Sequence, residues 1–237
     1  LIQKKIVKYN VKFIPIDSEH FSIQSLIKNN KNIEIDTIFI TASGGPFLKT
    51  PMTQFKNISA KKATKHPNWK MGKKISVDSA NLMNKVFEVI EACKIFNFDN
   101  EKFKIMIHPQ SYVHSIIRYK NGLVKMILYN SDMQIPISNT IYGRENNLSN
   151  IKNLNTKVLS KISFQNVDIK KFPSVKLINK SLNLGHSVPT IVNASNEVLV
   201  NLFLSQKIGF LDIVNTINRI FKDKDFKKYA KRQTKTI

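Results

Sequence analysis

Residues 76–96 read SVDSANLMNKVFEVIEACKIF, and this stretch decides the fold of the chain. It carries a row of apolar side chains at the three- and four-residue spacing of a helix: Leu82, Val86, Val89 and Cys93. We therefore predict a long helix from about Ser79 to Phe96 that packs this row against a sheet. On such a face the chain's single cysteine is expected to be a buried thiol rather than a nucleophile.

The opposite face of this predicted helix is polar. At about 100° per residue, Asn84, Lys85 and Glu88 fall on the same side. Asp78 or Ser79 is expected to cap the helix start, where free backbone N–H groups and the helix dipole favour an anion. An amide, an ammonium and a hydroxyl at that place suit a phosphate. Geometry alone favours a plainer alternative, a capped surface helix with a Lys85–Glu88 contact.

On the N-terminal side of this stretch the pattern predicts strands joined by one helix. The expected elements are a strand at Val11–Asp17 that Pro15 ends or places at an edge, a helix at Ser18–Ile27, a strand at Ile33–Thr41 and a short strand at Ile75–Val77. The second strand runs into Ala42-Ser43-Gly44-Gly45-Pro46, a turn where backbone can approach a ligand closely.

On the C-terminal side a hairpin precedes a helical region. Ile105–His108 is predicted as a strand, and Val113–Tyr119 and Leu123–Tyr129 flank the turn Lys120-Asn121-Gly122. Strands that alternate with helices before this hairpin predict an α/β domain, residues 1–145, with a mainly parallel sheet plus the antiparallel hairpin. Residues 146–170 read as a linker. An all-α C-terminal domain, residues 171–237, follows with helices at Val175–Leu184, Thr190–Leu204 and Asp212–Phe221.

Composition narrows the class of protein. The 237 residues are 42% hydrophobic with 15 Phe, which is typical of a globular chain. No apolar run reaches the roughly 18 residues of a membrane span, so no membrane partner is expected. The 38 Lys and Arg against 16 Asp and Glu give a net charge of +22 and raise the alternative of a nucleic-acid-binding module. Lys and Asn occur together throughout, which indicates a compositional bias, and we expect no nucleic-acid partner.

Asp17 and Glu19 form a second polar group. In a continuing strand, residues i and i+2 point to the same face, so the two carboxylates would converge on a hard divalent cation such as Mg²⁺. The alternative is structural: Asp17 or Ser18 caps the next helix and Glu19 complements its dipole. The pattern by itself favours the structural alternative.

Two further segments carry polar groups on loops. The Gly pair after Ser43 lets backbone N–H groups face a phosphate or a carbonyl, although a tight turn is the generic explanation and a lone Gly pair is a weak signal. No Gly-x-Gly-x-x-Gly fingerprint occurs among the seven glycines. His66 and Trp69 suit a substrate lid or, equally, a surface loop with one partly buried Trp. His108 and His114 are expected to be buried and structural.

The amino-acid sequences of these segments, and their order along the chain, resemble one family over nearly the whole chain. The matching stretches are PIDSEH at 15–20, ASGGPF at 42–47, HPNWKMGKKISVDS at 66–79, NKVFE at 84–88, IHPQS at 107–111 and NASNE at 193–197. They resemble 1-deoxy-D-xylulose 5-phosphate reductoisomerases of the non-mevalonate pathway of isoprenoid synthesis. The run from His66 to Glu88 is the most specific of them, and it outweighs the plainer alternatives that each segment allows alone.

The resemblance assigns roles by position. It implies that Asp17, Glu19 and Glu88 hold Mg²⁺ or Mn²⁺ and, with His66, are catalytic residues. It places the substrate phosphate at four residues: Ser43, Ser79, Asn84 and Lys85. It implies that Ser18 contacts the substrate backbone and that a closing loop covers the substrate with His66, Trp69 and Met71. Met71 and Met133 match positions near the nicotinamide of NADPH.

The resemblance also implies an activity. It is a metal-dependent rearrangement of a phosphorylated sugar, 1-deoxy-D-xylulose 5-phosphate, and reduction by NADPH to 2-C-methyl-D-erythritol 4-phosphate. Residues 1–145 would form the central catalytic domain, holding metal, substrate and the contacts of a homodimer, and phosphonate hydroxamates would inhibit. The family's N-terminal NADPH domain is expected to be absent, leaving this chain alone inactive. The Lys, Asn and Ile bias favours a plastid-type organelle, with the bacterial cytoplasm as the alternative.

Overall fold

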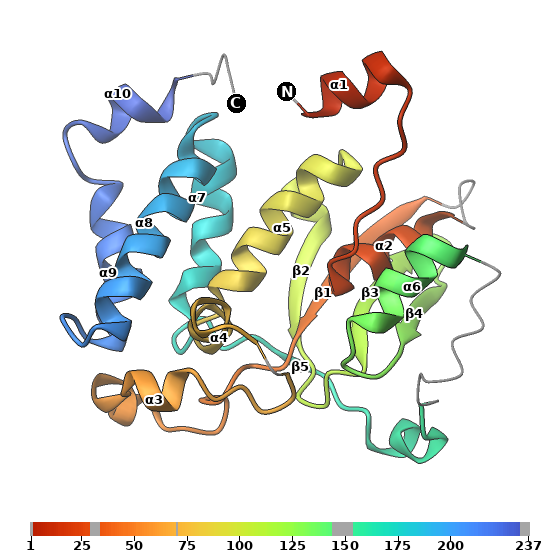
Figure 1. Ribbon diagram of the computed structural model, residues 1–237, viewed down its shortest axis with the longest axis horizontal. Helices are drawn as coiled ribbons and strands as arrows, with labels where there is room; N and C mark the ends of the chain where they lie inside the picture. Colours follow the sequence, from red (N-terminus) through yellow and green to blue (C-terminus); the bar gives the residue numbers. More distant parts are fainter. Residues whose placement is uncertain (1, 29–33, 70, 144–153, 233–237) are drawn as a thin grey trace.

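A computed structural model of the chain describes residues 2–28, 34–69, 71–143 and 154–232 (Figure 1). Its centre is a five-stranded sheet in the order β4-β3-β1-β2-β5. The strands are β1 (Ile35–Ala42), β2 (Phe103–Ile107), β3 (Val113–Tyr119), β4 (Val124–Leu128) and β5 (Gln165–Asn166). Only β1 and β2 pair in parallel, and the other three neighbouring pairs are antiparallel.

The helices lie around this sheet and to one side of it. They are α1 (Ile2–Tyr9), α2 (Ser18–Lys28), α3 (Ala60–Ala63), α4 (Lys73–Ala80), α5 (Met83–Phe96), α6 (Gln134–Tyr142), α7 (Leu177–Asn183), α8 (Val188–Leu204), α9 (Phe210–Ile220) and α10 (Phe226–Ala230). Helix α2 contacts β3, α5 contacts β1, and the two helices contact each other. Figure 1 shows α7 to α10 gathered beyond α5, away from the hairpin. No helix in the described part of the chain is long and apolar enough to cross a membrane.

The α/β architecture, the hairpin and the helical C-terminal region are confirmed. The sheet itself is mixed rather than mainly parallel, because β1 pairs antiparallel with β3 of the hairpin and a two-residue strand, β5, adds to the other edge. This β5 arises within the predicted linker, whose residues 146–153 lie outside the described part of the chain. The division at residues 145 and 171 stays a prediction.

The long helix predicted from Ser79 is wrong in its first turn. Helix α4 ends at Ala80 and α5 begins at Met83, because the Asn81 side chain accepts a bond from the Met83 N–H at 3.0 Å. Between them Leu82 has φ 61°, the left-handed region that a buried leucine rarely adopts. The strand predicted at Ile75–Val77 is also wrong, since those residues belong to α4. Three residues are too few to distinguish the two-residue repeat of a strand from the 3.6-residue repeat of a helix.

The segment Val11–Asp17 is not a strand. It forms no ladder with any described strand, and its apolar side chains Val11, Phe13 and Ile16 are about half exposed. The alternating apolar pattern of this segment therefore predicted a strand that does not pair with the described strands. The segment leads directly into α2, whose first residues carry part of the candidate site.

A continuous apolar core joins the sheet to the C-terminal helices. It runs from Ile38 on β1 through Val86 and Val89 on α5 to Val200 on α8 and Ile213 on α9. Of the apolar row predicted on the long helix, Val86, Val89 and Cys93 are confirmed on the buried face of α5, whereas Leu82 is buried just before the helix begins; Cys93 is a buried free thiol. This packing fixes α5 against the sheet and turns its polar face toward α2.

Candidate functional site

A cavity of about 320 Å³ opens at the carboxyl ends of the parallel strands β1 and β2. All twelve residues to which the sequence assigned a role line it: Asp17, Ser18, Glu19, Ser43, His66, Trp69, Met71, Ser79, Asn84, Lys85, Glu88 and Met133. They come from segments more than a hundred residues apart. The structure therefore brings the predicted site together in one place, while the role of each residue stays a prediction.

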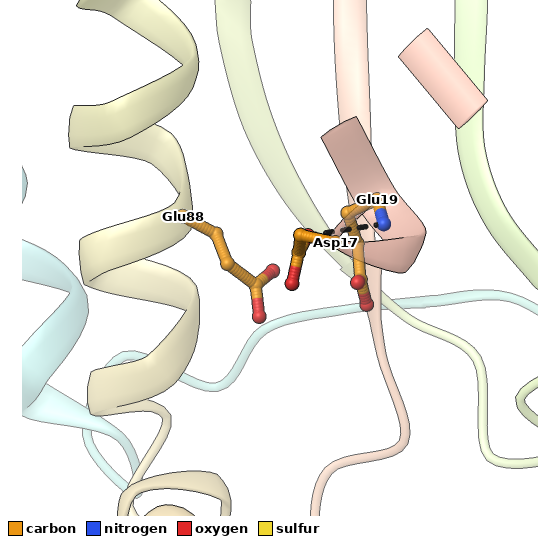
Figure 2. Close-up of side chains that lie close together, drawn as sticks. All are labelled: Asp17, Glu19 and Glu88. Carbon is orange, nitrogen blue, oxygen red and sulfur yellow. Dashed lines mark hydrogen bonds between the residues drawn. The ribbon is translucent and has the colours of Figure 1, made fainter. Parts of the chain in front are cut away.

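Three carboxylates meet in this cavity (Figure 2). One oxygen each of Asp17, Glu19 and Glu88 lies within 4.8 Å of the others. Asp17 precedes α2 and accepts bonds from the N–H groups of Glu19 at 3.2 Å and His20 at 3.4 Å. Asp17 thus caps α2, and its carboxylate also meets that of Glu19 in the cavity. The two carboxylates do not meet through the i and i+2 geometry of a strand, because Glu19 lies in the first turn of a helix.

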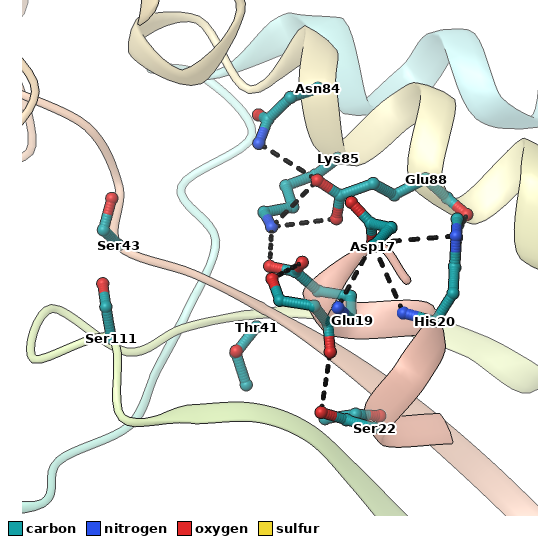
Figure 3. Close-up of polar contacts among 12 residues, drawn as sticks. Asp17, Glu19, His20, Ser22, Thr41, Ser43, Asn84, Lys85, Glu88 and Ser111 are labelled. Atoms are coloured by element: carbon teal, nitrogen blue, oxygen red, sulfur yellow. Dashed lines mark hydrogen bonds and ion pairs between the residues drawn. The ribbon is translucent and has the colours of Figure 1, made fainter. Parts of the chain in front are cut away.

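Lys85 bridges two of the carboxylates (Figure 3). Its Nζ donates to Glu19 and to both oxygens of Glu88, at 2.8 and 3.1 Å. Asn84 donates from Nδ2 to Glu88 Oε1 at 3.2 Å. The predicted sharing of one α5 face by these residues is confirmed, and the Lys85–Glu88 contact of the plainer alternative exists inside the cavity rather than on the surface.

The electrostatics of the cluster are unbalanced. Burial raises the pKa of Glu19, but the Lys85 charge, the His114 charge and the hydrogen bonds from Lys85 and Ser18 together lower that pKa to about 2. Burial, and then the charge of Glu19, raise the pKa of Glu88 well above its usual range. One ammonium cannot balance three carboxylates. A divalent cation together with that ammonium can, and carboxylate oxygens are the donors that Mg²⁺ and Mn²⁺ prefer, so the residues present fit such an ion.

Hydroxyls and amides form the other half of the cavity. Gly45 has φ +65°, and a Cβ there would lie 2.8 Å from the Ser79 carbonyl oxygen, so only glycine lets this turn pack on the end of α4. That contact holds this turn against the end of α4, and Ser43 and Ser79 line the same cavity as Lys85. Asn84 Oδ1 is buried without a hydrogen-bond partner among the described residues and is free to meet a ligand.

The prediction that Asp78 or Ser79 caps the helix carrying Asn84 and Lys85 is wrong. Ser79 lies in the last turn of α4, and Asp78 one residue before it, so neither caps α5. The residue before α5 is Leu82, which offers no side-chain cap. Ser79 therefore reaches the cavity from a helix end, while Asn84 and Lys85 reach it from the first turn of the next helix.

The loop that carries His66 is tied to the cavity wall. His66 Nδ1 accepts from the N–H groups of Asn68 at 3.1 Å and Trp69 at 2.9 Å. Burial, and then the nearby Lys85 charge, lower the pKa of His66 to about 4, so the ring is neutral and carries its proton on Nε2. Nε2 lies 3.1 Å from Ser43 Oγ and therefore donates to it.

Several lining residues were not predicted to belong to the site: Thr41, Ile75, His108, Ser111, Val113 and His114. The structural role predicted for His108 fits its bonds, which join the Ser163 carbonyl at 2.9 Å and the Tyr112 N–H at 3.1 Å. His114 is buried as predicted and stacks on Tyr129, but its Nε2 has no partner among the described residues and lines the cavity. Ligand sites at the carboxyl ends of adjacent parallel strands are a general rule that would have found Thr41 and Ser111.

Fold and cavity define a class: an α/β protein whose cavity brings three carboxylates together beside a group of hydroxyls and amides. Two family models match the chain. One, described as the 1-deoxy-D-xylulose 5-phosphate reductoisomerase C-terminal domain, matches residues 13–96, and the other, the DXP reductoisomerase C-terminal domain, matches residues 128–237. The chain belongs to the 1-deoxy-D-xylulose 5-phosphate reductoisomerase family.

Individual relatives agree with the family models. The chain is 46% identical to the 1-deoxy-D-xylulose 5-phosphate reductoisomerase of Pelagibacter ubique over 237 residues, all of this chain and 61% of that protein. It is 44% identical to the Wolbachia pipientis enzyme, covering 92% of this chain and 56% of that one. The chain therefore spans less than two thirds of each relative's length.

Solved structures of the same enzyme share the fold. The Zymomonas mobilis reductoisomerase in complex with NADPH matches 98% of this chain with a TM-score of 0.86 and 32% identity, over 59% of its own length. A DOX-P reductoisomerase structure with fosmidomycin and magnesium matches 98% of this chain with a TM-score of 0.88 and 32% identity, again over 59% of its length.

Proposed function

We propose that this protein serves the metal-dependent rearrangement of 1-deoxy-D-xylulose 5-phosphate and its reduction by NADPH to 2-C-methyl-D-erythritol 4-phosphate, a step of isoprenoid synthesis. The observation that carries the proposal is the convergence of three carboxylates and Lys85 with Ser43, Ser79 and Asn84 in one cavity. A sugar phosphate presents vicinal oxygens at one end and a dianion at the other, which matches the two halves of this cavity.

The carboxylates Asp17, Glu19 and Glu88 would hold Mg²⁺ or Mn²⁺. When bound, the ion supplies Lewis-acid polarisation of substrate oxygens. The protein's own contribution is to aim these oxygens: Asp17 is fixed by two backbone N–H bonds, and Glu88 is fixed by Asn84. Ser18 Oγ donates to Glu19 at 2.5 Å and lines the cavity, where it would contact the substrate backbone.

The substrate phosphate would lie against Ser43, Ser79, Asn84 and Lys85. Two hydroxyls, an amide and an ammonium offer it charge-assisted hydrogen bonds. Binding at this remote end can be used for orientation at the metal. Phosphonate hydroxamates are proposed to bind with the hydroxamate at the carboxylates and the phosphonate here, as supported by fosmidomycin complexes of the solved relatives.

The loop with His66, Trp69 and Met71 would cover the bound substrate and exclude water. Neutral His66 is suited to hydrogen bonding rather than to charge, and it already holds Ser43. Met71 and Met133 line the cavity with apolar atoms, which suits the face of a nicotinamide ring. When bound, NADPH would supply the hydride, and the Zymomonas mobilis relative solved in complex with NADPH supports this choice of cofactor.

A homodimer is proposed from the family, and an exposed apolar surface supports it. This surface lies on β4, α6 and the residues beside them: Leu123, Val124, Met126, Ile141 and Tyr142. The named relatives are bacterial, which supports a bacterial location, the second of the two predicted alternatives, rather than a plastid-type organelle.

The test is substrate-dependent oxidation of NADPH by the complete protein that contains these residues, with and without Mg²⁺ or Mn²⁺. We expect oxidation only with both deoxyxylulose phosphate and a divalent metal. A folded protein that binds metal and NADPH but shows no turnover would refute the proposal. The same assay on the 237-residue chain tests the separate prediction that it is inactive alone.

A further inference from the structure

The turn between α4 and α5 is held by the C-terminal helical region. Asn196 on α8 donates from Nδ2 to Asp78 Oδ1 at 2.8 Å. Ser174, in a short helical turn before α7, donates to the Asn81 carbonyl at 2.5 Å. All four residues are at most 5% exposed. Both bonds come from beyond residue 170 and end on the residues that flank Ser79.

The backbone at this turn needs outside support. Leu82 has φ 61° and ψ 18° and is 1% exposed. A left-handed leucine costs about 1–3 kcal/mol and persists only where the surrounding structure determines it. Asn84 and Lys85 follow directly on α5, so the position of this turn sets where their side chains enter the cavity.

Asp78 connects three parts of the protein. Besides Asn196, its carboxylate accepts from Lys74 Nζ at 2.9 Å, and Lys74 lies in the first turn of α4, just after the loop of His66 and Trp69. The next residue is Ser79, which lines the cavity, whereas Asp78 does not line it. Burial raises the pKa of Asp78, so this carboxylate depends on its two donors.

We propose that Asp78 is a positioning residue for the phosphate subsite, held by Asn196, so that the C-terminal helices set the geometry of Ser79, Asn84 and Lys85. The inference rests on the proposed function only in taking these residues as the phosphate subsite. It assigns Asp78 no contact with substrate. Its consequence is that a bond to α8, outside the cavity, controls affinity for the phosphate end of the ligand.

The test exchanges the two side chains. Asn196→Asp sets two carboxylates face to face and removes the donor, while Asp78→Asn together with Asn196→Asp restores one donor and one acceptor in reverse order. Asn179→Ala is the matched control, because it breaks the 2.9 Å bond from Asn100 to Asn179, which joins the same two regions away from the turn. Ser174→Ala tests the second bond if Asn196→Asp fails to fold.

The readouts on the 237-residue chain are calorimetric affinities for inorganic phosphate, for fosmidomycin with Mg²⁺ present, and for Mn²⁺ alone. We expect Asn196→Asp to weaken phosphate and fosmidomycin binding by roughly tenfold, the loss of one charge-assisted bond, with Mn²⁺ affinity kept within about threefold. The double variant should recover most of the loss, and Asn179→Ala should lose none. In the complete protein the KM for substrate should rise more than kcat falls.

Unchanged phosphate and fosmidomycin affinity in a less stable Asn196→Asp protein would overturn the inference, because Asp78 would then be merely structural. Equal weakening by Asn179→Ala would overturn it as well. Fosmidomycin binding without turnover of deoxyxylulose phosphate by the complete protein would remove the proposed function alone. A wild-type chain that binds Mn²⁺ but neither phosphate nor fosmidomycin would remove the phosphate subsite and this inference with it.

Discussion

Lys85 is the buried cation paired with Glu19 and Glu88, and Lys85→Met tests how much this pairing stabilises the protein. The side chain is 7% exposed, and its partners Glu19 and Glu88 are 10% and 11% exposed. Methionine keeps the length and the apolar stem but removes the charge. Removing one partner of a buried ion pair costs about 3–5 kcal/mol, because the remaining charge is left uncompensated. We expect the free energy of unfolding to fall by that amount at neutral pH.

The pH dependence of this loss has a definite sign. Burial, and then Glu19, raise the pKa of Glu88, so Glu88 takes a proton as the pH falls. A protonated Glu88 needs no cation, and the loss in Lys85→Met should therefore shrink between neutral pH and about pH 5. Mg²⁺ should stabilise the variant more than the wild type, because the ammonium no longer competes for the same oxygens.

The assay is urea unfolding of the wild type and the variant, at both pH values and with and without Mg²⁺. Lys120→Met is the control, since the Lys120–Glu34 pair is 57% and 66% exposed and solvent screens such a pair, so its loss should cost little stability. If Lys85→Met costs no more than Lys120→Met, or if its cost grows as the pH falls, the reasoning is refuted.

Three further predictions concern the metal, acid stability and the glycine turn. Glu88→Gln should weaken Mn²⁺ binding at least roughly tenfold and abolish turnover with the fold intact; calorimetry that finds normal Mn²⁺ affinity would remove Glu88 from the metal site. Burial lowers the pKa of His114 to about 4, so the unfolded chain binds the extra proton first and unfolding free energy falls between about pH 6.5 and 4, by up to about 3 kcal/mol. In urea unfolding at several pH values, the free energy of unfolding of His114→Gln should lack this part of the pH dependence. Gly45→Ala should cost at least about 2 kcal/mol more than Gly122→Ala in the same assay, because both have positive φ but only Gly45 would clash, and equal costs would mean that the turn relaxes.

Periodicity predicted the parts of this protein that depend on local pattern. The apolar row of α5 and its polar face with Asn84, Lys85 and Glu88 follow from the 3.6-residue repeat, and the hairpin follows from alternation around Asn121-Gly122. The break at Leu82 did not follow, because a left-handed leucine is imposed by burial and by bonds from Ser174 and Asn196, more than 90 residues away. Local pattern contains no such information.

For Asp17 the two interpretations, a helix cap and a metal ligand, do not exclude each other. The residues alone favoured a helix cap over a metal ligand, and the structure shows the cap: Asp17 Oδ1 accepts two N–H bonds at the start of α2. Those same bonds aim the carboxylate at Glu19 and Glu88. A cap leaves lone pairs on a carboxylate unused, so one side chain can both start a helix and bind a cation. The Lys85–Glu88 contact behaves in the same way, as a helix-stabilising pair whose charges lie inside the cavity. In a compact site the atoms that fix the backbone are the atoms available for chemistry, and a structural role for such a residue is therefore no argument against a functional one.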